Sequence, residues 1–145
     1  MGLLLDEDYV YLTEIGLEYV EVAGPRFLIF RNFALPGGVY RSGSEVRNAV
    51  DVLYVIPSNY NASGGDMFWV YPYLERVDGK AIPNVNVGGP GQDSRSHDGI
   101  EYLRWSRHWH GKPWLPKVDN VQKIVDRITW AFAHPDAKLL ISAEN

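Results

Sequence analysis

The sequence predicts an α+β fold in which an antiparallel β-meander carries a helix packed on one face. Two observations predict it: three apolar segments rich in β-forming residues follow one another in the first half of the chain, and a strongly amphipathic segment lies near its end. Consecutive strands followed by a helix are an element order typical of α+β proteins. The chain has 145 residues, of which 46% are hydrophobic, so we expect one domain over residues 1–145 with a core of its own.

The first half of the chain carries the expected strands. Residues 6–17 mix acidic and apolar positions loosely at helical spacing, which favours a short helix or an irregular lead-in. Residues 26–35, 50–56 and 67–71 are rich in aromatic and β-branched residues, and a proline follows each of these segments. The second of them is almost continuously apolar, as expected of an interior strand.

The second half of the chain contains a long loop and then the strongest helix signal. Residues 78–99 are rich in Gly, Pro, Asn, Asp and Ser, so we expect regular structure to lapse there, and a loop of that length is usually functional or mobile. The glycines within residues 88–91 lack the Gly-Lys-Ser/Thr ending of a phosphate-binding loop. Residues 118–132 place apolar side chains three and four positions apart, which predicts an amphipathic helix of about four turns that ends before Pro135.

Composition and charge argue against several classes of function. The formal net charge is -4 and the basic residues are scattered, so we predict no nucleic acid partner. No apolar run approaches the roughly 20 residues that span a bilayer, and the first leucines follow no basic region, so we predict neither a membrane partner nor a secretory signal and expect a cytoplasmic protein. The absence of cysteine excludes disulfides, thiolate zinc sites and a thiol nucleophile.

Residues 104–116 form the densest chemical patch, with three tryptophans, two histidines and a hydroxyl in the run Arg-Trp-Ser-Arg-His-Trp-His-Gly-Lys-Pro-Trp-Leu-Pro. Aromatic residues at this density indicate burial or a binding surface, so a tryptophan-rich plug over the core is one interpretation. Ser106 is a candidate nucleophile if a histidine base activates its hydroxyl. The candidate partners within nine residues of it are His97, Asp98, His108 and His110. The same side chains could instead bind a metal ion, although their spacing matches no zinc signature.

The order of the motifs resembles the ubiquitin-conjugating enzymes, most closely the short prokaryotic members encoded beside ubiquitin-like proteins and activating-enzyme homologues. Ile56-Pro-Ser-Asn-Tyr60 looks like the aromatic-Pro-x-x-Tyr-Pro segment of that family, with Asn61 in place of the second proline. Gly65-Asp-Met-Phe-Trp-Val70 resembles the strand that follows, and Trp114-Leu-Pro116 resembles the Trp-x-Pro motif before the helix. The resemblance implies the conjugating-enzyme fold over roughly residues 27–135, lacking the two C-terminal helices of the longer eukaryotic members.

Two further positions, both in the proposed site, depart from the family pattern. The family places its acceptor cysteine eight residues before the tryptophan of Trp-x-Pro, and Ser106 holds that position here. Asp98 stands where the His-Pro-Asn motif of the family has its asparagine. A serine forms an oxyester instead of a thioester. An ionised aspartate only accepts hydrogen bonds, so the stabilisation of an oxyanion would pass to His97, His108 or backbone amides.

The resemblance implies acyl transfer with an activating enzyme and a ubiquitin-like modifier as partners, and no cofactor. Ser106 would accept the C-terminal acyl group of the modifier and pass it to an amine. His97 or His108 would be the general base, and Asp98 would orient that histidine or the incoming lysine. Three alternatives remain open: a non-catalytic binding module of the same fold, a variant in which serine replaces a native cysteine, and a metal-dependent hydrolase built on His97, His108 and His110.

Overall fold

A computed structural model describes residues 2–65, 67–85, 93–107 and 113–136 of the chain. Their helices are α1 (Asp6–Ile15) and α2 (Val121–Ala133). Their strands are β1 (Tyr19–Val22), β2 (Phe27–Ala34), β3 (Tyr40–Ser42), β4 (Glu45–Arg47), β5 (Ala49–Val55), β6 (Met67–Tyr71), β7 (Glu75–Arg76), β8 (Ser94–His97) and β9 (Ile100–Ser106).

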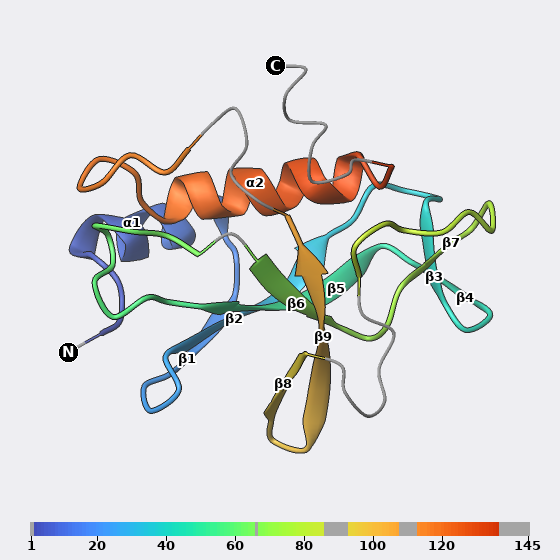
Figure 1. The fold of residues 1–145 in the computed structure, drawn as a ribbon, viewed down its shortest axis with the longest axis horizontal. Helices are drawn as coiled ribbons and strands as arrows, with labels where there is room; N and C mark the ends of the chain where they lie inside the picture. Colours follow the sequence, from blue (N-terminus) through green and yellow to red (C-terminus); the bar gives the residue numbers. More distant parts are fainter. Residues whose placement is uncertain (1, 66, 86–92, 108–112, 137–145) are drawn as a thin grey trace.

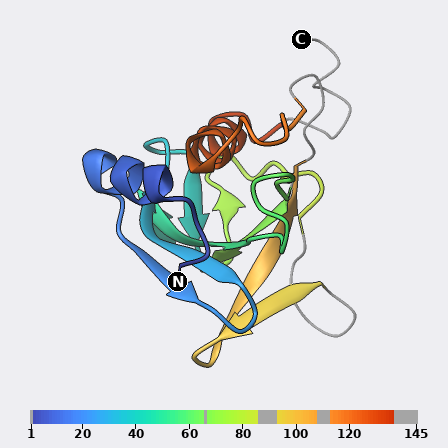
Figure 2. The same cartoon turned by 90° about the vertical axis from the view of Figure 1, so that its left-hand side faces the viewer.

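These strands form one large and one small antiparallel sheet. The large sheet has the order β1-β2-β5-β6-β9-β8, and α2 lies across one of its faces (Figure 1). It is curled, with the edge strands β1 and β8 on the side away from α2 (Figure 2). The small sheet has the order β4-β3-β7 and lies beside the end of α2.

The interior strands of the large sheet are the segments with the longest apolar runs. In the antiparallel pair β2 and β5, Leu28 lies opposite Tyr54 and Ile29 lies opposite Leu53. The exposed fraction of these four side chains is 2% or less. Since successive side chains of a strand point to opposite faces, the first pair packs in the main core and the second in a smaller cluster on the other face. Both faces of β2 and β5 are therefore covered, which explains why these strands are apolar throughout.

The apolar face of α2 closes the main core. The buried residues of this helix are Val121, Ile124, Val125, Ile128, Ala131 and Phe132. The ring of Phe132 lies with its centroid 5.0 Å from that of Trp105 and 5.5 Å from that of Phe68, in edge-on geometry. Asn120 caps the helix by accepting a hydrogen bond from the Gln122 amide at 3.1 Å, a contact that contributes about 1 kcal/mol.

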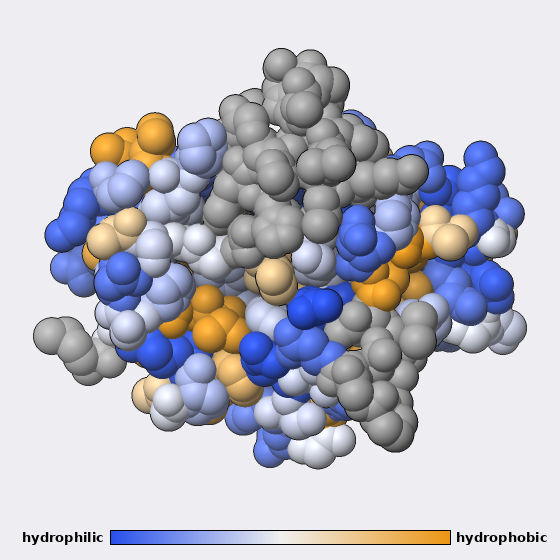
Figure 3. All heavy atoms as spheres, viewed as in Figure 1, coloured by the Kyte–Doolittle hydropathy of each residue, from blue (hydrophilic) through white to orange (hydrophobic). Residues whose placement is uncertain are grey.

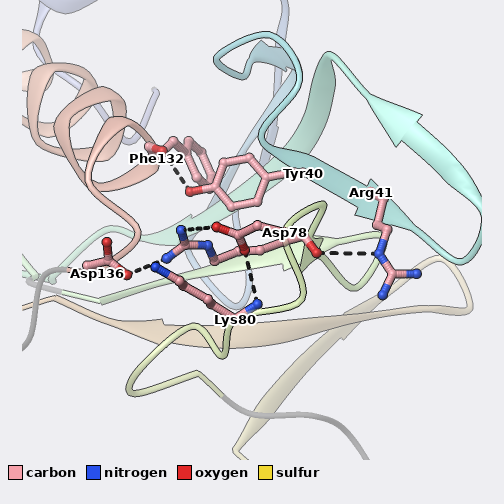
Figure 4. A network of polar contacts seen from close by, with 7 residues as sticks. Tyr40, Arg41, Asp78, Lys80, Phe132 and Asp136 are labelled. Carbon is pink, nitrogen blue, oxygen red and sulfur yellow. Dashed lines mark hydrogen bonds and ion pairs between the residues drawn. The ribbon is translucent and has the colours of Figure 1, made fainter.

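Polar contacts join the small sheet to the end of α2 (Figure 4). The Tyr40 hydroxyl on β3 donates a hydrogen bond of 2.6 Å to the Phe132 carbonyl. The guanidinium of Arg76 on β7 forms an ion pair of 2.5 Å with Asp78 and a second one with Asp136, beyond the helix. These contacts fix the position of β3 and β7 against the helical layer.

Among the coloured residues of the face seen in Figure 3, the hydrophobic ones form several separate areas with hydrophilic residues between them. The large hydrophobic residues with exposed side chains are Val10, Ile15, Val20, Val46, Tyr71, Tyr73, Val77, Leu115 and Val118. Within the ranges that the structure covers, no helix combines the length and the apolar composition needed to cross a membrane.

The structure confirms the α+β fold with an antiparallel meander and a helix on one face. The strands predicted at 26–35, 50–56 and 67–71 are β2, β5 and β6. The helix predicted from residue 118 is α2, which begins at Val121 behind its Asn120 cap. It is the last helix among the residues described.

The expectation that regular structure lapses over residues 78–99 is wrong at its end. β8 lies within this segment and pairs with β9 through a two-residue turn, Asp98 and Gly99. Both turn residues have positive φ, 56° and 77°, as a type I′ hairpin turn requires. The first residues of the tryptophan-rich patch, 104–106, belong to β9.

Candidate functional site

Ser106 is the last residue of β9. It lies opposite Met67 of β6, and its amide donates a hydrogen bond of 3.0 Å to the Asn84 carbonyl on the other side. Neighbouring backbone therefore holds the residue from both sides. The residue is buried, with an exposed fraction of 8%.

A buried arginine follows Ser106 directly. Arg107 is 3% exposed, and its Nη1 donates to the Ser106 carbonyl at 2.9 Å and to the Pro83 carbonyl at 3.0 Å. Its guanidinium carbon lies 5.0 Å from the centroid of the Trp105 ring, a cation–π contact. The amide and the carbonyl of Ser106 are thus both tied to the segment that contains Pro83 and Asn84.

The two segments that resemble conjugating-enzyme motifs contact each other. The Trp114 indole donates a hydrogen bond of 3.0 Å to the Asn61 carbonyl, and its ring lies with its centroid 6.0 Å from that of Tyr60. The Lys117 amide donates to the same Asn61 carbonyl at 3.0 Å. A Cβ on Gly64 would lie 2.5 Å from the Trp114 ring, so only glycine fits there without a shift. The turn after β5 therefore fixes the position of Trp114, which follows β9 in the chain.

A buried carboxylate joins this turn to both helices. Asp8 of α1 is 1% exposed and accepts hydrogen bonds from the Tyr60 hydroxyl at 2.7 Å, the Val121 amide at 3.1 Å and the Leu5 amide at 3.0 Å. Burial, followed by the hydrogen bond to Asp8, raises the pKa of the Tyr60 hydroxyl above its ordinary value. The start of α2 and the turn at Tyr60 thus share one acceptor.

A sequence match names the family to which this fold and these motifs belong. Residues 4–135 match the family described as prokaryotic E2 family E. The chain belongs to this prokaryotic E2 family. The matched range contains every helix and strand described above, from α1 to the end of α2. No curated protein and no solved structure matches the chain.

Membership of the prokaryotic E2 family indicates a conjugating-enzyme-like role. E2 proteins act as transferases in ubiquitin-like conjugation, in which they interact with an activating enzyme and a modifier. The match includes Ser106 and both motif segments, the turn at Tyr60 and the Trp114 region. It therefore confirms the resemblance from which the acceptor position was inferred, while the role of each residue remains a separate question.

In this E2 family member, the structure does not bring His97 or Asp98 to Ser106. His97 ends β8 opposite Ile100, the first residue of β9, and Asp98 lies in the turn between them. Ser106 is at the other end of β9, about 20 Å away at roughly 3.3 Å per strand residue. This placement corrects the expectation that His97 acts as the base for Ser106 with Asp98 orienting it, because a regular strand separates the two ends of the hairpin.

His108 and His110, the two histidines of the patch at residues 104–116, lie outside the described residues. Their roles as general bases or as metal ligands stay predictions. Among the residues that the structure does describe, no group of three or more histidine, aspartate or glutamate side chains is placed to bind a metal ion.

Sequence reasoning missed two neighbours of Ser106 in this E2 protein. Asn84 accepts the Ser106 amide from a segment expected to be irregular, and no residue pattern indicates that this segment pairs with β9. Arg107 follows Ser106 in the sequence, but arginine is mostly exposed in proteins, so the sequence gives no indication that this side chain is buried. The only available hint was the density of tryptophans around it, which indicates a packed environment.

Proposed function

We propose that this E2 family member carries an acyl group on Ser106 within a ubiquitin-like conjugation pathway. An activating enzyme supplies the C-terminal acyl group of the modifier, Ser106 holds it as an oxyester, and an amine receives it. The single observation that supports the choice of residue is the place of Ser106, which ends β9 eight residues before Trp114. Family membership supports the reaction class.

The proposed general base is His108, on sequence grounds alone. It lies two residues after Ser106 in the chain. His97 and Asp98 take no part in the proposed reaction because the length of β9 separates them from Ser106. Asp98 instead acts as a turn residue, since its positive φ is a conformation that aspartate tolerates better than most side chains.

The test is a covalent adduct with defined chemistry. The purified protein is combined with its activating enzyme, the modifier and ATP, and the expected adduct resists thiol reductant but is cleaved by hydroxide. Ser106→Ala should abolish it. Ser106→Cys should give an adduct that thiol reductant cleaves, because this cysteine would be the sole thiol of the chain. Ser96→Ala, on the exposed side of β8, is the matched control and should leave the adduct unchanged.

Two results would contradict the proposal. An adduct of unchanged yield in Ser106→Ala places the acyl group on another residue. A wild-type protein that forms no adduct, although the activating enzyme is charged with the modifier, is not an acyl carrier.

A non-catalytic binding module of the same fold is the second candidate. It is favoured by the backbone that holds Ser106 from both sides, at Met67 and at Asn84, and by the exposed fraction of Ser106, which is only 8%. A cavity of about 240 Å³ between β7 and residues 79–85 offers such a module a place for a partner segment. This candidate predicts a complex with the activating enzyme or the modifier whose affinity does not change in Ser106→Ala, with no covalent species.

A protein in which serine replaces a native cysteine would behave in a third way. The protein with Ser106 would then form an adduct that accumulates without passing to an amine. Ser106→Cys would restore transfer to the amine, and the transfer assay separates this case from both candidates above.

A further inference from the structure

The guanidinium of Arg107 is a buried positive charge that forms no ion pair with a carboxylate of residues 2–65, 67–85, 93–107 and 113–136. Its Nη1 donates to two backbone carbonyls, those of Ser106 and Pro83. Its Nε and Nη2 are sealed from solvent and have no hydrogen-bond partner in the described part of the chain. A buried charge without a counter-ion lowers the stability of a folded protein, so a functional role would explain why the chain has an arginine at this position.

The charged and titratable groups around Arg107 do not neutralise it. Arg127 of α2 has the same sign of charge, and the Tyr40 hydroxyl of β3 keeps its proton because burial raises its pKa. Burial lowers the pKa of Arg107 to about 10, and the nearby charge of Arg127 also lowers it. The group nevertheless remains protonated near neutral pH, about three units below that value.

The space beside Arg107 is too small for a counter-ion. The cavity lined by Arg107, Arg127 and the apolar residues around Met67 has a volume of about 10 Å³, which is room for roughly one water molecule. A carboxylate cannot enter it without movement of the packed side chains. This cavity therefore holds no negative charge that balances Arg107.

The backbone contacts of Arg107 connect its charge to Ser106. Its Nη1 lies 2.9 Å from the Ser106 carbonyl, and the Ser106 amide is held by Asn84 at 3.0 Å. The end of β9 is thus fixed next to a positive charge in an interior of low polarity, where charges interact over several ångströms far more strongly than in water. Negative charge that develops on the reacting atoms at Ser106 would be stabilised there.

We propose that Arg107 is the positioning residue of acyl transfer at Ser106: it clamps the end of β9 to the Pro83–Asn84 segment and stabilises the oxyanion by its charge. This rests on the proposed function. The Ser106 hydroxyl adds to the carbonyl carbon of the modifier's activated ester, a new C–O bond forms, and the bond to the activating enzyme breaks. The departing group takes up the proton that the serine loses. Arg107 supplies the positive charge that aspartate at position 98 cannot.

The test compares Arg107→Met, Arg107→Gln and Arg107→Lys with the wild type in single-turnover formation of the Ser106 adduct across pH. In Arg107→Met we expect the maximal rate to fall on the order of 10-fold to 100-fold. The concentration of charged activating enzyme at half-maximal rate should stay unchanged, and the rise of the rate with pH should move to higher pH. Arg107→Lys should recover part of the rate, because it keeps the charge. Arg31→Met, an arginine on β2 with its own ion pair to Asp51, is the control and should keep the wild-type rate.

Thermal unfolding of the same variants separates this role from a structural one. Replacing an unpaired buried charge with an apolar side chain of similar length should leave the unfolding temperature unchanged or raise it. A rate loss without a stability loss, with recovery by lysine, supports the proposal.

A wild-type rate in Arg107→Met overturns the proposal. A rate loss in all three variants that parallels the decrease in their unfolding temperatures overturns it as well. If Arg107→Met does not fold, the lysine and glutamine variants decide by the same criteria. A wild-type protein that forms no adduct overturns the acyl-carrier function and this inference together, whereas an adduct with no sensitivity to Arg107 overturns the inference alone.

Discussion

Two buried charged side chains at opposite ends of the chain are satisfied to very different degrees. Asp8 is 1% exposed and accepts three hydrogen bonds that join α1, the turn at Tyr60 and the start of α2. Arg107 is 3% exposed, and only one of its three guanidinium nitrogens has partners among the described residues. The first arrangement is what stability requires of a buried charge. The incomplete hydrogen bonding of the Arg107 guanidinium is typical of charged groups at functional sites.

Removal of the Asp8 carboxylate should destabilise the fold strongly. Asp8→Ala leaves two backbone amides and the Tyr60 hydroxyl without their acceptor in a buried place, at about 1–3 kcal/mol for each group that water does not reach. We expect the free energy of unfolding in urea to fall by about 3 kcal/mol.

Asp6→Ala is the matched control for this prediction, since Asp6 is an exposed aspartate in the same first turn of α1. Its unfolding free energy should change by less than about 0.5 kcal/mol. Equal effects of the two substitutions would mean that the shared carboxylate at Asp8 does not hold the three segments together.

The β8–β9 hairpin shows how an element can change the interpretation of a motif. Asp98 matched the asparagine position of the conjugating-enzyme motif by counting along the chain, but it lies in a turn that requires positive φ. Local backbone chemistry therefore explains this residue without a catalytic role. Asp-Gly is a strong hairpin signal between two strand-forming runs. The run before this turn, Ser-Arg-Ser-His, contains no apolar residue, so apolar alternation does not identify it as a strand.

Substitutions in this turn should affect stability and leave the chemistry intact. Gly99→Ala places a side chain at φ 77° and should lower the free energy of unfolding by about 1 kcal/mol, although open space surrounds the new Cβ. Asp98→Asn, which tolerates the same backbone conformation, should change it by less than about 0.5 kcal/mol. Both are measured by urea unfolding, and the adduct assay on Asp98→Asn should give the wild-type yield. A large loss of adduct in Asp98→Asn would return this residue to the reaction.

The elements that the sequence predicted correctly are those with one strong physical signal. β2, β5 and β6 are apolar runs that end before prolines, and α2 repeats its apolar residues at helical spacing. β1, β3, β4 and β7 were not predicted because each has only two to four residues, too few for a periodicity to show. The candidate site is similar: the spacing to Trp114 predicts Ser106 as the acceptor, which stays a prediction, while the contacts of Ser106 with Asn84 and Arg107 depend on tertiary pairing that no local pattern encodes.

Tyrosines with raised pKa values lie throughout the molecule. They are Tyr9, Tyr11, Tyr40, Tyr60 and Tyr102. Burial is the largest cause in each case, and for Tyr9, whose pKa is raised to about 12, the hydrogen bond to Glu21 is the next. A folded protein that holds these protons more tightly than the unfolded chain gains stability at neutral pH that it loses as pH rises.

We therefore expect a stability that is constant from neutral pH to about pH 9 and falls above about pH 10, the ordinary pKa of tyrosine. The sign follows because each raised pKa favours the protonated folded state, so the contribution is complete below the unfolded value and is lost above it. Urea unfolding at intervals from pH 7 to 11 measures this. Tyr60→Phe should lower the stability at pH 7 and make the decline above pH 10 less steep. The exposed Tyr73 serves as control, and Tyr73→Phe should reproduce the wild-type curve. A wild-type stability that rises between pH 9 and 11 would contradict the assignment.

The contacts of Asp8 have a practical consequence for shortened versions of this protein. The first helix looks dispensable in the ribbon because it lies beside the sheet and not within it (Figure 1). Yet deletion of residues 1–17 would remove the Asp8 carboxylate. This group accepts hydrogen bonds from the first amide of α2 and from the hydroxyl of Tyr60, whose ring packs beside Trp114. Expression plasmids intended for crystallisation or interaction screens should consequently keep the chain from Leu3 onward, whose amide donates a hydrogen bond to Glu21.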